Sequence, residues 1–138
     1  MKQYILVFMF LSGIFGPLFA HACENSTKDI SLHLSHRSAK TKHIQTGIAS
    51  WYGPGFHGRP MANGRPYNAQ ALTIAHRTLP LGQKICVRNL ENGKAVEVKV
   101  TDRGPYIPGR IVDLSEKTAE ELGMKKQGVM RVSLTEVR

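Results

Sequence analysis

The chain has 138 residues, a length that suits one small domain. It contains 19 Lys and Arg against 10 Asp and Glu, which gives a formal net charge of +9 at pH 7. Two cysteines exclude both a four-cysteine zinc site and a small scaffold held together by several disulfides. Only the beginning of the chain is a long apolar run, so the composition also excludes a polytopic membrane protein.

Residues 1–22 have the organisation of an export signal. Lys2 supplies the single charge, residues 4–20 form an apolar core, and residues 20–22 read Ala-His-Ala, a small-x-small cleavage site. A transmembrane anchor is the alternative, but two glycines and a proline late in the run disfavour it. We therefore expect export across the inner membrane, into the periplasm or cell envelope.

Cys23 directly follows this signal, and two fates are open to its thiol. Lipid on such a cysteine would attach the protein to a membrane, whereas Ala-x-Ala at residues 20–22 fits ordinary signal-peptidase cleavage better. Cys86 shares one face of a predicted strand with Lys84 and Arg88, so its thiol is expected to face outward in an oxidising compartment. Its intramolecular partner would be Cys23, and a lipidated Cys23 could not form that disulfide.

Residues 23–43 are predicted to be a flexible linker, because they are rich in Ser, Thr, Lys and His. His33, His36 and His43 have no accompanying cluster of cysteines or carboxylates, so neither a metal site nor a cofactor is predicted. Residues 44–138 are the predicted domain, and they retain a basic excess. That charge suits an anionic partner such as a cell-wall polymer, while export argues against nucleic acid.

The secondary structure of the domain is predicted to be mostly β. Apolar and polar residues alternate over residues 84–90, 96–101 and 130–135, which is the period of half-buried strands. One helix is expected, with Ser115 as its N-cap and Gly123 as its stop. Many short strands with Gly and Pro turns and a single short helix predict a small closed barrel.

Three ordered groups of motifs carry a family resemblance. They read GIASWYG at residues 47–53, AHRTLPLG at 75–82, and DRGPY at 102–106 followed by GRIVDLS at 109–115. Together they resemble the rare lipoprotein A (RlpA) family over residues 47–137. The resemblance implies a mainly β fold, a six-stranded double-psi β-barrel with one short helix. It also implies an exported protein whose active relatives are lytic transglycosylases that prefer peptidoglycan glycan strands without stem peptides.

The third motif is also similar to the first domain of expansins, which share the barrel and bind wall polysaccharides. In that comparison Asp102 and Asp113 are the paired aspartates of the cleft, and Asp113 corresponds to the acid of related endoglucanases. A lytic transglycosylase needs one carboxylic acid that later acts as a base. We therefore predict that Asp113 and Asp102 are catalytic. Alternatively, Asp102 caps a turn, and Asp113 holds the helix N-terminus or pairs with Arg110.

Further site candidates come from the remaining motif residues. His76 is predicted to be catalytic as a proton shuttle, with a structural histidine as the alternative. Aromatic faces stack on sugar rings, so Trp51, Tyr52 and Tyr106 are predicted to bind substrate, with core packing as the alternative for Trp51. The basic candidates for substrate binding are Arg65, Arg103 and Arg110. The residues expected to line one cleft are Asp102, Asp113, His76 and Trp51.

The chain departs from its active relatives at two acid positions. After Asn-Gly those relatives usually continue Glu-x-Tyr/Phe-Asp, whereas here Arg65 and Asn68 occupy the two acid positions. Arginine cannot donate a proton usefully at neutral pH, but its planar fork can bind an anionic sugar carboxylate. The principal prediction is a peptidoglycan lytic transglycosylase. The alternatives are a non-catalytic, expansin-like glycan-binding module and an exported basic domain recruited to a protein complex.

Overall fold

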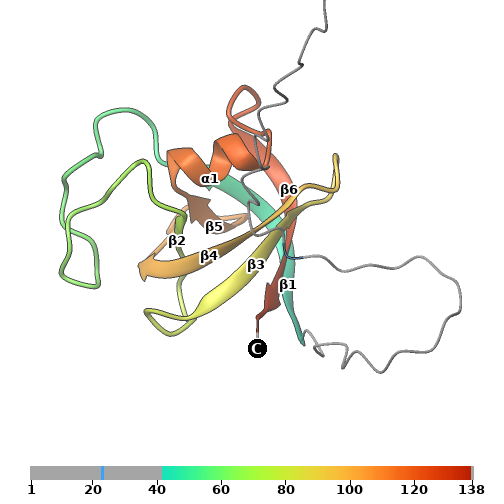
Figure 1. Ribbon diagram of the computed structural model, residues 1–138, viewed down its shortest axis with the longest axis horizontal. Coiled ribbons are helices and arrows are strands. Elements are labelled where there is room, and N and C mark those ends of the chain that lie inside the picture. Colours follow the sequence, from blue (N-terminus) through green and yellow to red (C-terminus); the bar gives the residue numbers. More distant parts are fainter. Residues whose placement is uncertain (1–22, 24–41, 138) are drawn as a thin grey trace, which may run out of the picture.

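The structure is a computed structural model that describes Cys23 and residues 42–137 (Figure 1). The predicted export signal and residues 24–41 of the predicted linker lie outside the described residues. Within the described part, no helix is long and apolar enough to cross a membrane. The elements in chain order are β1 (Lys42–Trp51), β2 (Thr73–Ala75), β3 (Lys84–Asn89), β4 (Ala95–Asp102), β5 (Arg110–Leu114), α1 (Glu116–Glu121) and β6 (Val129–Glu136).

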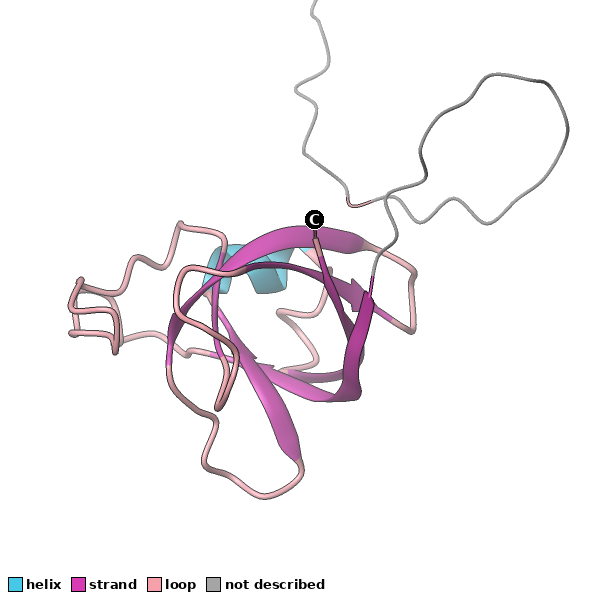
Figure 2. Cartoon of the chain, turned by 90° about the horizontal axis from the view of Figure 1, so that it is seen from below, coloured by secondary structure: helices cyan, strands magenta, loops and turns pink. Residues whose placement is uncertain are grey.

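The six strands close into a barrel in the order β1-β5-β2-β4-β3-β6. The β1–β5 and β2–β4 pairs are parallel, and the other four pairs are antiparallel. Figure 2 shows the strands enclosing the barrel, with α1 on its outside. The prediction of a closed six-stranded barrel with one short helix is confirmed.

Alternation along the strands fills the barrel interior. Val96, Val98 and Val100 of β4 are buried, and so are Val132 and Leu134 of β6. The intervening residues on both strands are more exposed, which is the arrangement expected for a strand with one face on a core. The three predicted strands therefore agree with the observed ones to within two residues at each end.

Local capping defines helix α1 as the sequence predicts. The Ser115 hydroxyl accepts a hydrogen bond from the Thr118 backbone N–H at 3.2 Å and donates one to the Ala71 carbonyl at 2.6 Å. Gly123 then ends the helix in the left-handed region, with φ of 69°. The cap thus fixes the helix and also ties it to the chain just before β2.

Asn89 joins the β3–β4 turn to the end of α1. Its side chain is fully buried, donates to the Leu122 carbonyl at 2.8 Å and accepts from the Glu91 backbone N–H at 2.8 Å. The Asn92 side chain donates to the same carbonyl at 2.9 Å but is exposed. Loss of the Asn89 hydrogen bonds should lower the stability more than loss of the Asn92 bond, because water cannot replace a side chain that is fully buried.

We expect Asn89→Ala to lower the free energy of unfolding by about 2 kcal/mol, because it removes a fully buried side chain that donates to the Leu122 carbonyl and accepts from the Glu91 backbone N–H. Urea denaturation of the purified protein measures this. Asn92→Ala is the matched control, since it removes a donor to the same carbonyl at an exposed position. Equal losses in the two variants would contradict the role of burial.

Strand β1 begins earlier than the predicted domain. Lys42 pairs with Glu136 and His43 with Thr135, so the last two residues of the predicted linker belong to the barrel. The prediction was wrong there because these residues are polar and exposed, and only pairing with β6 makes them a strand. The long connection between β1 and β2, teal to green in Figure 1, projects from one side of the barrel.

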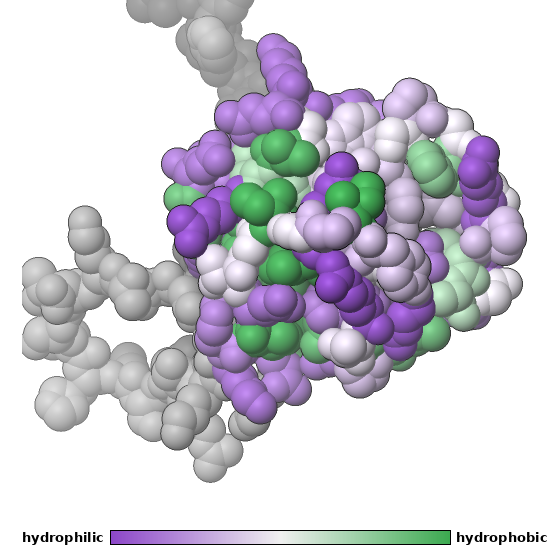
Figure 3. Space-filling model, turned by 180° about the vertical axis from the view of Figure 1, so that it is seen from behind, coloured by the Kyte–Doolittle hydropathy of each residue, from purple (hydrophilic) through white to green (hydrophobic). Residues whose placement is uncertain are grey.

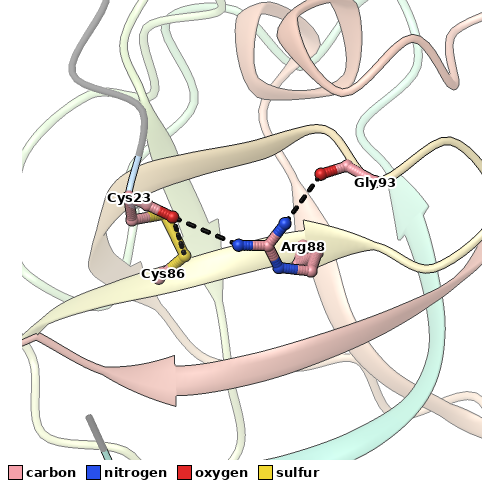
Figure 4. Close-up of a disulfide and its surroundings, with 4 residues drawn as sticks. All are labelled: Cys23, Cys86, Arg88 and Gly93. Atoms are coloured by element: carbon pink, nitrogen blue, oxygen red, sulfur yellow. Dashed lines mark hydrogen bonds between the residues drawn. A yellow bond between two sulfur atoms is a disulfide. The ribbon is translucent and has the colours of Figure 1, made fainter. Parts of the chain in front are cut away.

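Cys23 is joined to strand β3 by a disulfide with Cys86 (Figure 4). Arg88 braces the junction, because its guanidinium donates to the Cys23 carbonyl at 3.3 Å and to the Gly93 carbonyl at 2.8 Å. Cys86 is 5% exposed, although Ile85 and Val87 occupy the core face of the strand. Cys86 lies outside the core cluster that contains Ile85 and Val87, as predicted, and its thiol is bonded to Cys23, the pairing that the sequence left open.

This disulfide bears directly on the candidate lipid attachment at Cys23. A sulfur bonded to Cys86 cannot also carry a thioether to lipid, so the disulfide form of the chain is not lipidated at this residue. The sequence could not decide between the two fates, because the separation of 63 residues gives no sign of whether the two thiols meet.

The face of the molecule shown in Figure 3 is mainly hydrophilic, with small hydrophobic patches interrupted by polar residues. Small apolar patches of this kind are ordinary on protein surfaces. The hollows of the surface and the charged groups that line them are therefore its more distinctive features.

Candidate active site

The order of the strands brings two aspartates together. Strand β2 lies between β4 and β5, and its last residue, Ala75, is paired with Asp102 on one side and with Asp113 on the other. Two strand spacings separate the aspartate Cα atoms by roughly 10 Å. Barrel closure thus places the two predicted catalytic carboxylates on either side of one small residue.

Both aspartates line one hollow of about 410 Å³, which we call the aspartate groove. The C-terminal end of β4, the loop after it and the β1–β2 connection form its walls. Its lining residues are Tyr52, Phe56, Arg59, Pro60, Met61, Tyr67, Asp102, Arg103, Gly104, Pro105, Tyr106, Ile107 and Asp113.

Asp102 is fully engaged as a hydrogen-bond acceptor. Its Oδ1 accepts from the backbone N–H of Ala62 at 2.9 Å and of Arg103 at 2.8 Å. Its Oδ2 accepts from the Tyr52 hydroxyl at 3.0 Å. Burial, followed by the charge of Asp102, raises the pKa of Tyr52 far above its usual range, so the hydroxyl keeps its proton and remains a donor. Three hydrogen-bond donors therefore fix the orientation of the Asp102 side chain.

Asp113 lies in a different environment. Burial raises its pKa, the Arg110 guanidinium opposes that effect, and the negative charge of Asp102 adds to it. Its Oδ1 is buried and lacks a hydrogen-bond partner, because the Arg110 nitrogen at 3.9 Å lies too far for a hydrogen bond. A raised pKa favours the protonated form of a carboxyl, and Asp113 lines the groove, so it is the candidate proton donor of the site.

His76 does not reach the aspartate groove. Its Nδ1 accepts from the backbone N–H groups of Thr78 and Leu79 at 3.2 and 3.1 Å, which leaves Nε2 to donate to Gln45 at 3.3 Å. Burial, with the charges of Arg103 and Arg77, lowers its pKa, so the ring is neutral at pH 7. It lines a separate, smaller hollow beside Arg110.

The prediction that four residues share one cleft is therefore wrong for His76 and Trp51. Trp51 is half-buried and packs against the hydrophobic core, because β1 turns its side chain toward the barrel rather than the groove. The prediction holds for Asp102 and Asp113. Sequence spacing could not separate these outcomes, since all four residues lie near Gly or Pro loops.

The remaining substrate-binding candidates are divided between hollows. Tyr52, Arg103 and Tyr106 line the aspartate groove, and Tyr106 is 79% exposed. Arg110 lies in the hollow of His76, next to Asp113. Arg65 lies in neither of these hollows but in another one, beside the aspartate groove.

Phe56, Arg59 and Tyr67 also line the groove, although they were not among the residues predicted from the sequence. The Arg59 guanidinium lies 4.9 Å from the centre of the Phe56 ring, and the Tyr52 ring contacts both Phe56 and Tyr67. Phe56 is 41% exposed in a Gly-rich loop, the same signal that singled out Tyr106.

No group of three or more His, Cys, Asp or Glu side chains suited to a metal ion occurs in the part of the chain that the structure describes. The arrangement in the aspartate groove is instead one of a proton donor, a fixed carboxylate and exposed aromatic surface.

Two parallel strand pairs within a closed six-stranded barrel place the protein among the double-psi β-barrels. An expansin from Clavibacter michiganensis has a similar structure. The match to its ligand-free form covers 71% of this chain and 50% of the expansin chain, with a TM-score of 0.53 and 25% sequence identity.

Residues 44–134 match the double-psi β-barrel family described as lytic transglycolase. The chain is 54% identical over 97 residues to a "Probable endolytic peptidoglycan transglycosylase RlpA" of Synechocystis, across 70% of this chain and 30% of that protein. It is 41% identical over 118 residues to an endolytic peptidoglycan transglycosylase RlpA of Neisseria meningitidis serogroup A. That match covers 85% of this chain and 49% of the Neisseria protein.

The chain therefore belongs to the double-psi β-barrel lytic transglycolase family, and the predicted resemblance to RlpA proteins is confirmed. It spans less than half the length of either curated relative.

Proposed function

We propose that this chain is an exported lytic transglycosylase of the cell envelope that cleaves peptidoglycan glycan strands, with a preference for strands lacking stem peptides. The observation that carries the proposal is the pair Asp102 and Asp113 in one groove, in unlike environments. One is a carboxylate held by three donors, and the other has a raised pKa and a free oxygen. Acid–base catalysts are recognised by such a difference between neighbouring carboxyls.

In the proposed reaction, Asp113 gives its proton to the glycosidic oxygen as the bond from that oxygen to the sugar C1 breaks. The 6-hydroxyl of the same sugar attacks C1 and passes its proton to the Asp113 carboxylate. This closes a 1,6-anhydro ring and restores the acid, without consuming water. The Asp102 carboxylate stabilises the positive charge that develops on the sugar ring in the transition state.

The exposed rings of Tyr106 and Phe56 supply stacking surface for sugars along the groove. His76 takes a positioning role in this proposal rather than a proton-transfer role. Its backbone N–H donates to the Asp102 carbonyl at 3.1 Å, and its carbonyl accepts from the Arg103 guanidinium at 3.1 Å. It therefore supports the segment that carries Asp102.

We expect Tyr106→Ala to weaken binding of peptide-free glycan strands by up to about tenfold, the value of one aromatic stacking contact. The melting temperature should not change, because the side chain is 79% exposed. Isothermal titration calorimetry measures the affinity. Val129→Ala, at another exposed apolar position, is the matched control and should bind as the wild type does.

The experiment that tests the proposed function is product analysis on purified peptide-free glycan strands. Mass spectrometry distinguishes 1,6-anhydro ends from the reducing ends that hydrolysis leaves, because the anhydro product lacks one water. New anhydro ends with the wild-type protein support the proposal. Intact strands, or reducing ends alone, would overturn it.

A second candidate is an expansin-like module that binds glycan without cutting it. The observation that favours it is the replacement of two acids of active relatives by Arg65 and Asn68. Against it, both residues line a hollow other than the aspartate groove, so the replacement leaves Asp102 and Asp113 in place. Binding without any cleavage product would decide for this candidate.

A further inference from the structure

A second hollow, of about 500 Å³, adjoins the aspartate groove, and we call it the basic hollow. Met61 lines both hollows. The turn that begins at Met61 is tied to the end of β4: the Ala62 backbone N–H donates to the Asp102 carboxylate, and the Asn63 N–H donates to the Thr101 carbonyl at 3.2 Å. One turn therefore separates the basic hollow from the aspartate groove, and a bound chain that crosses it would contact both.

The charged groups of the basic hollow are all cationic. Arg65 and Lys99 line it, and no carboxylate does. Neither side chain forms an ion pair within Cys23 and residues 42–137. Lys84, which faces Lys99 across the strand pair, is neutralised by Glu97 at 2.9 Å. Lys99 and Arg65 are thus left to attract a negative charge.

The uncharged polar groups point to the same kind of ligand. The Asn63 side-chain oxygen accepts from the Arg65 backbone N–H at 3.0 Å, and the Asn68 oxygen accepts from the Gln70 N–H at 2.9 Å. These bonds orient the turn and use the amide oxygens, which leaves the amide nitrogens to serve a ligand. The hollow therefore offers two cations and two amide donors, a set suited to a carboxylate.

We propose that the basic hollow binds the lactyl carboxylate of a muramic acid unit, one subsite along the strand from the bond cleaved in the aspartate groove. This inference rests on the proposed function, because it takes the ligand to be a peptidoglycan glycan strand. A strand without stem peptide carries a free carboxylate on each muramic acid, whereas a stem peptide converts that carboxylate to an amide. The hollow thus gives this chain a physical basis for preferring peptide-free strands.

Binding measurements on two matched ligands test the proposal. The first is a peptide-free strand, and the second is the same strand with its lactyl carboxylates converted to amides. We expect the wild-type protein to bind the first about tenfold more tightly, and the difference to shrink as salt is raised. The double variant Arg65→Gln, Lys99→Gln should bind both equally. Arg131→Gln, which removes an exposed cation on β6, is the control and should keep the full discrimination.

The outcomes separate this proposal from the proposed function. Equal wild-type affinity for the two ligands, or an equal loss of both in the double variant, would overturn the carboxylate site even if anhydro products form. Full discrimination without products would leave the site standing and reject the enzyme. Tighter binding of strands with intact stem peptides, lost in the double variant, would assign the hollow to peptide carboxylates and overturn the lactyl assignment.

Discussion

Asp113→Asn should greatly slow cleavage of glycan strands while raising the stability of the protein at neutral pH. An amide cannot donate the proton that the leaving oxygen needs, so the rate should fall by about a hundred- to ten-thousandfold. The substitution keeps the shape of the side chain, so glycan binding should be retained. Anhydro-end formation, followed over time by mass spectrometry, measures the rate.

The gain in stability follows from the raised pKa of Asp113 in the folded protein. A carboxyl whose folded pKa lies above its unfolded value costs no stability at low pH, where both states are protonated. As pH rises past the unfolded pKa, the unfolded state ionises first and the folded state loses relative stability, until the loss becomes constant above the folded pKa. Asparagine removes that loss, so its melting temperature should exceed that of the wild type at neutral pH and converge with it in acid.

The same raised pKa sets the direction of the pH dependence of activity. The first step needs protonated Asp113, so the rate should decline as pH rises through the pKa of that carboxyl.

Asp102→Asn is the informative comparison for stability. It would place an amide among three donors, so its melting temperature should fall rather than rise. Unchanged turnover in Asp113→Asn would reject Asp113 as the acid, and a lower melting temperature of Asp113→Asn at neutral pH would contradict the stability cost of its raised pKa.

Removing the Cys23–Cys86 disulfide should produce the largest loss of stability. The bond closes a loop across 63 residues, and the chain-entropy relation gives about 4 kcal/mol for a loop of this size. The effect acts on the unfolded chain, which gains freedom when the cross-link is absent. The Arg88 hydrogen bond to the Cys23 carbonyl would weaken as well.

Cys23→Ser is the cleanest variant, because Cys86 lies against the barrel and its replacement would add a packing cost. We expect the melting temperature of Cys23→Ser to fall by more than about 10 °C, as 1 kcal/mol corresponds to several degrees in a domain of this size. Wild-type protein under a reducing agent should melt at the same temperature as this variant. A melting temperature equal to that of oxidised wild type would show that the disulfide does not constrain the unfolded chain.

A mass measurement of the mature N-terminus decides which fate Cys23 takes in the cell. A loss of two hydrogens relative to the reduced chain, reversed by a reducing agent, identifies the disulfide. A diacylglyceryl mass on Cys23 would instead identify the lipoprotein form, in which Cys86 keeps a free thiol.

The features that could be predicted from the sequence are those that depend on residues close together in the chain. Alternation predicts β3, β4 and β6, because one face of each strand must be buried. Ser115 and Gly123 define the ends of α1, because capping involves residues three or four apart. The motifs also identified the family and, with it, the double-psi barrel. Asp102 and Asp113 were singled out by the same local pattern of Gly and Pro.

The tertiary structure decided what those residues face. Three-residue β2 has no sequence signal of its own, yet its position between β4 and β5 brings Asp102 and Asp113 to either side of Ala75. The same closure leaves His76 in another hollow and turns Trp51 to the core. Partners in a barrel are chosen by long-range pairing and burial, which act between residues far apart in the chain. For that reason the groove, the basic hollow and the cysteine pairing emerge only from the folded protein.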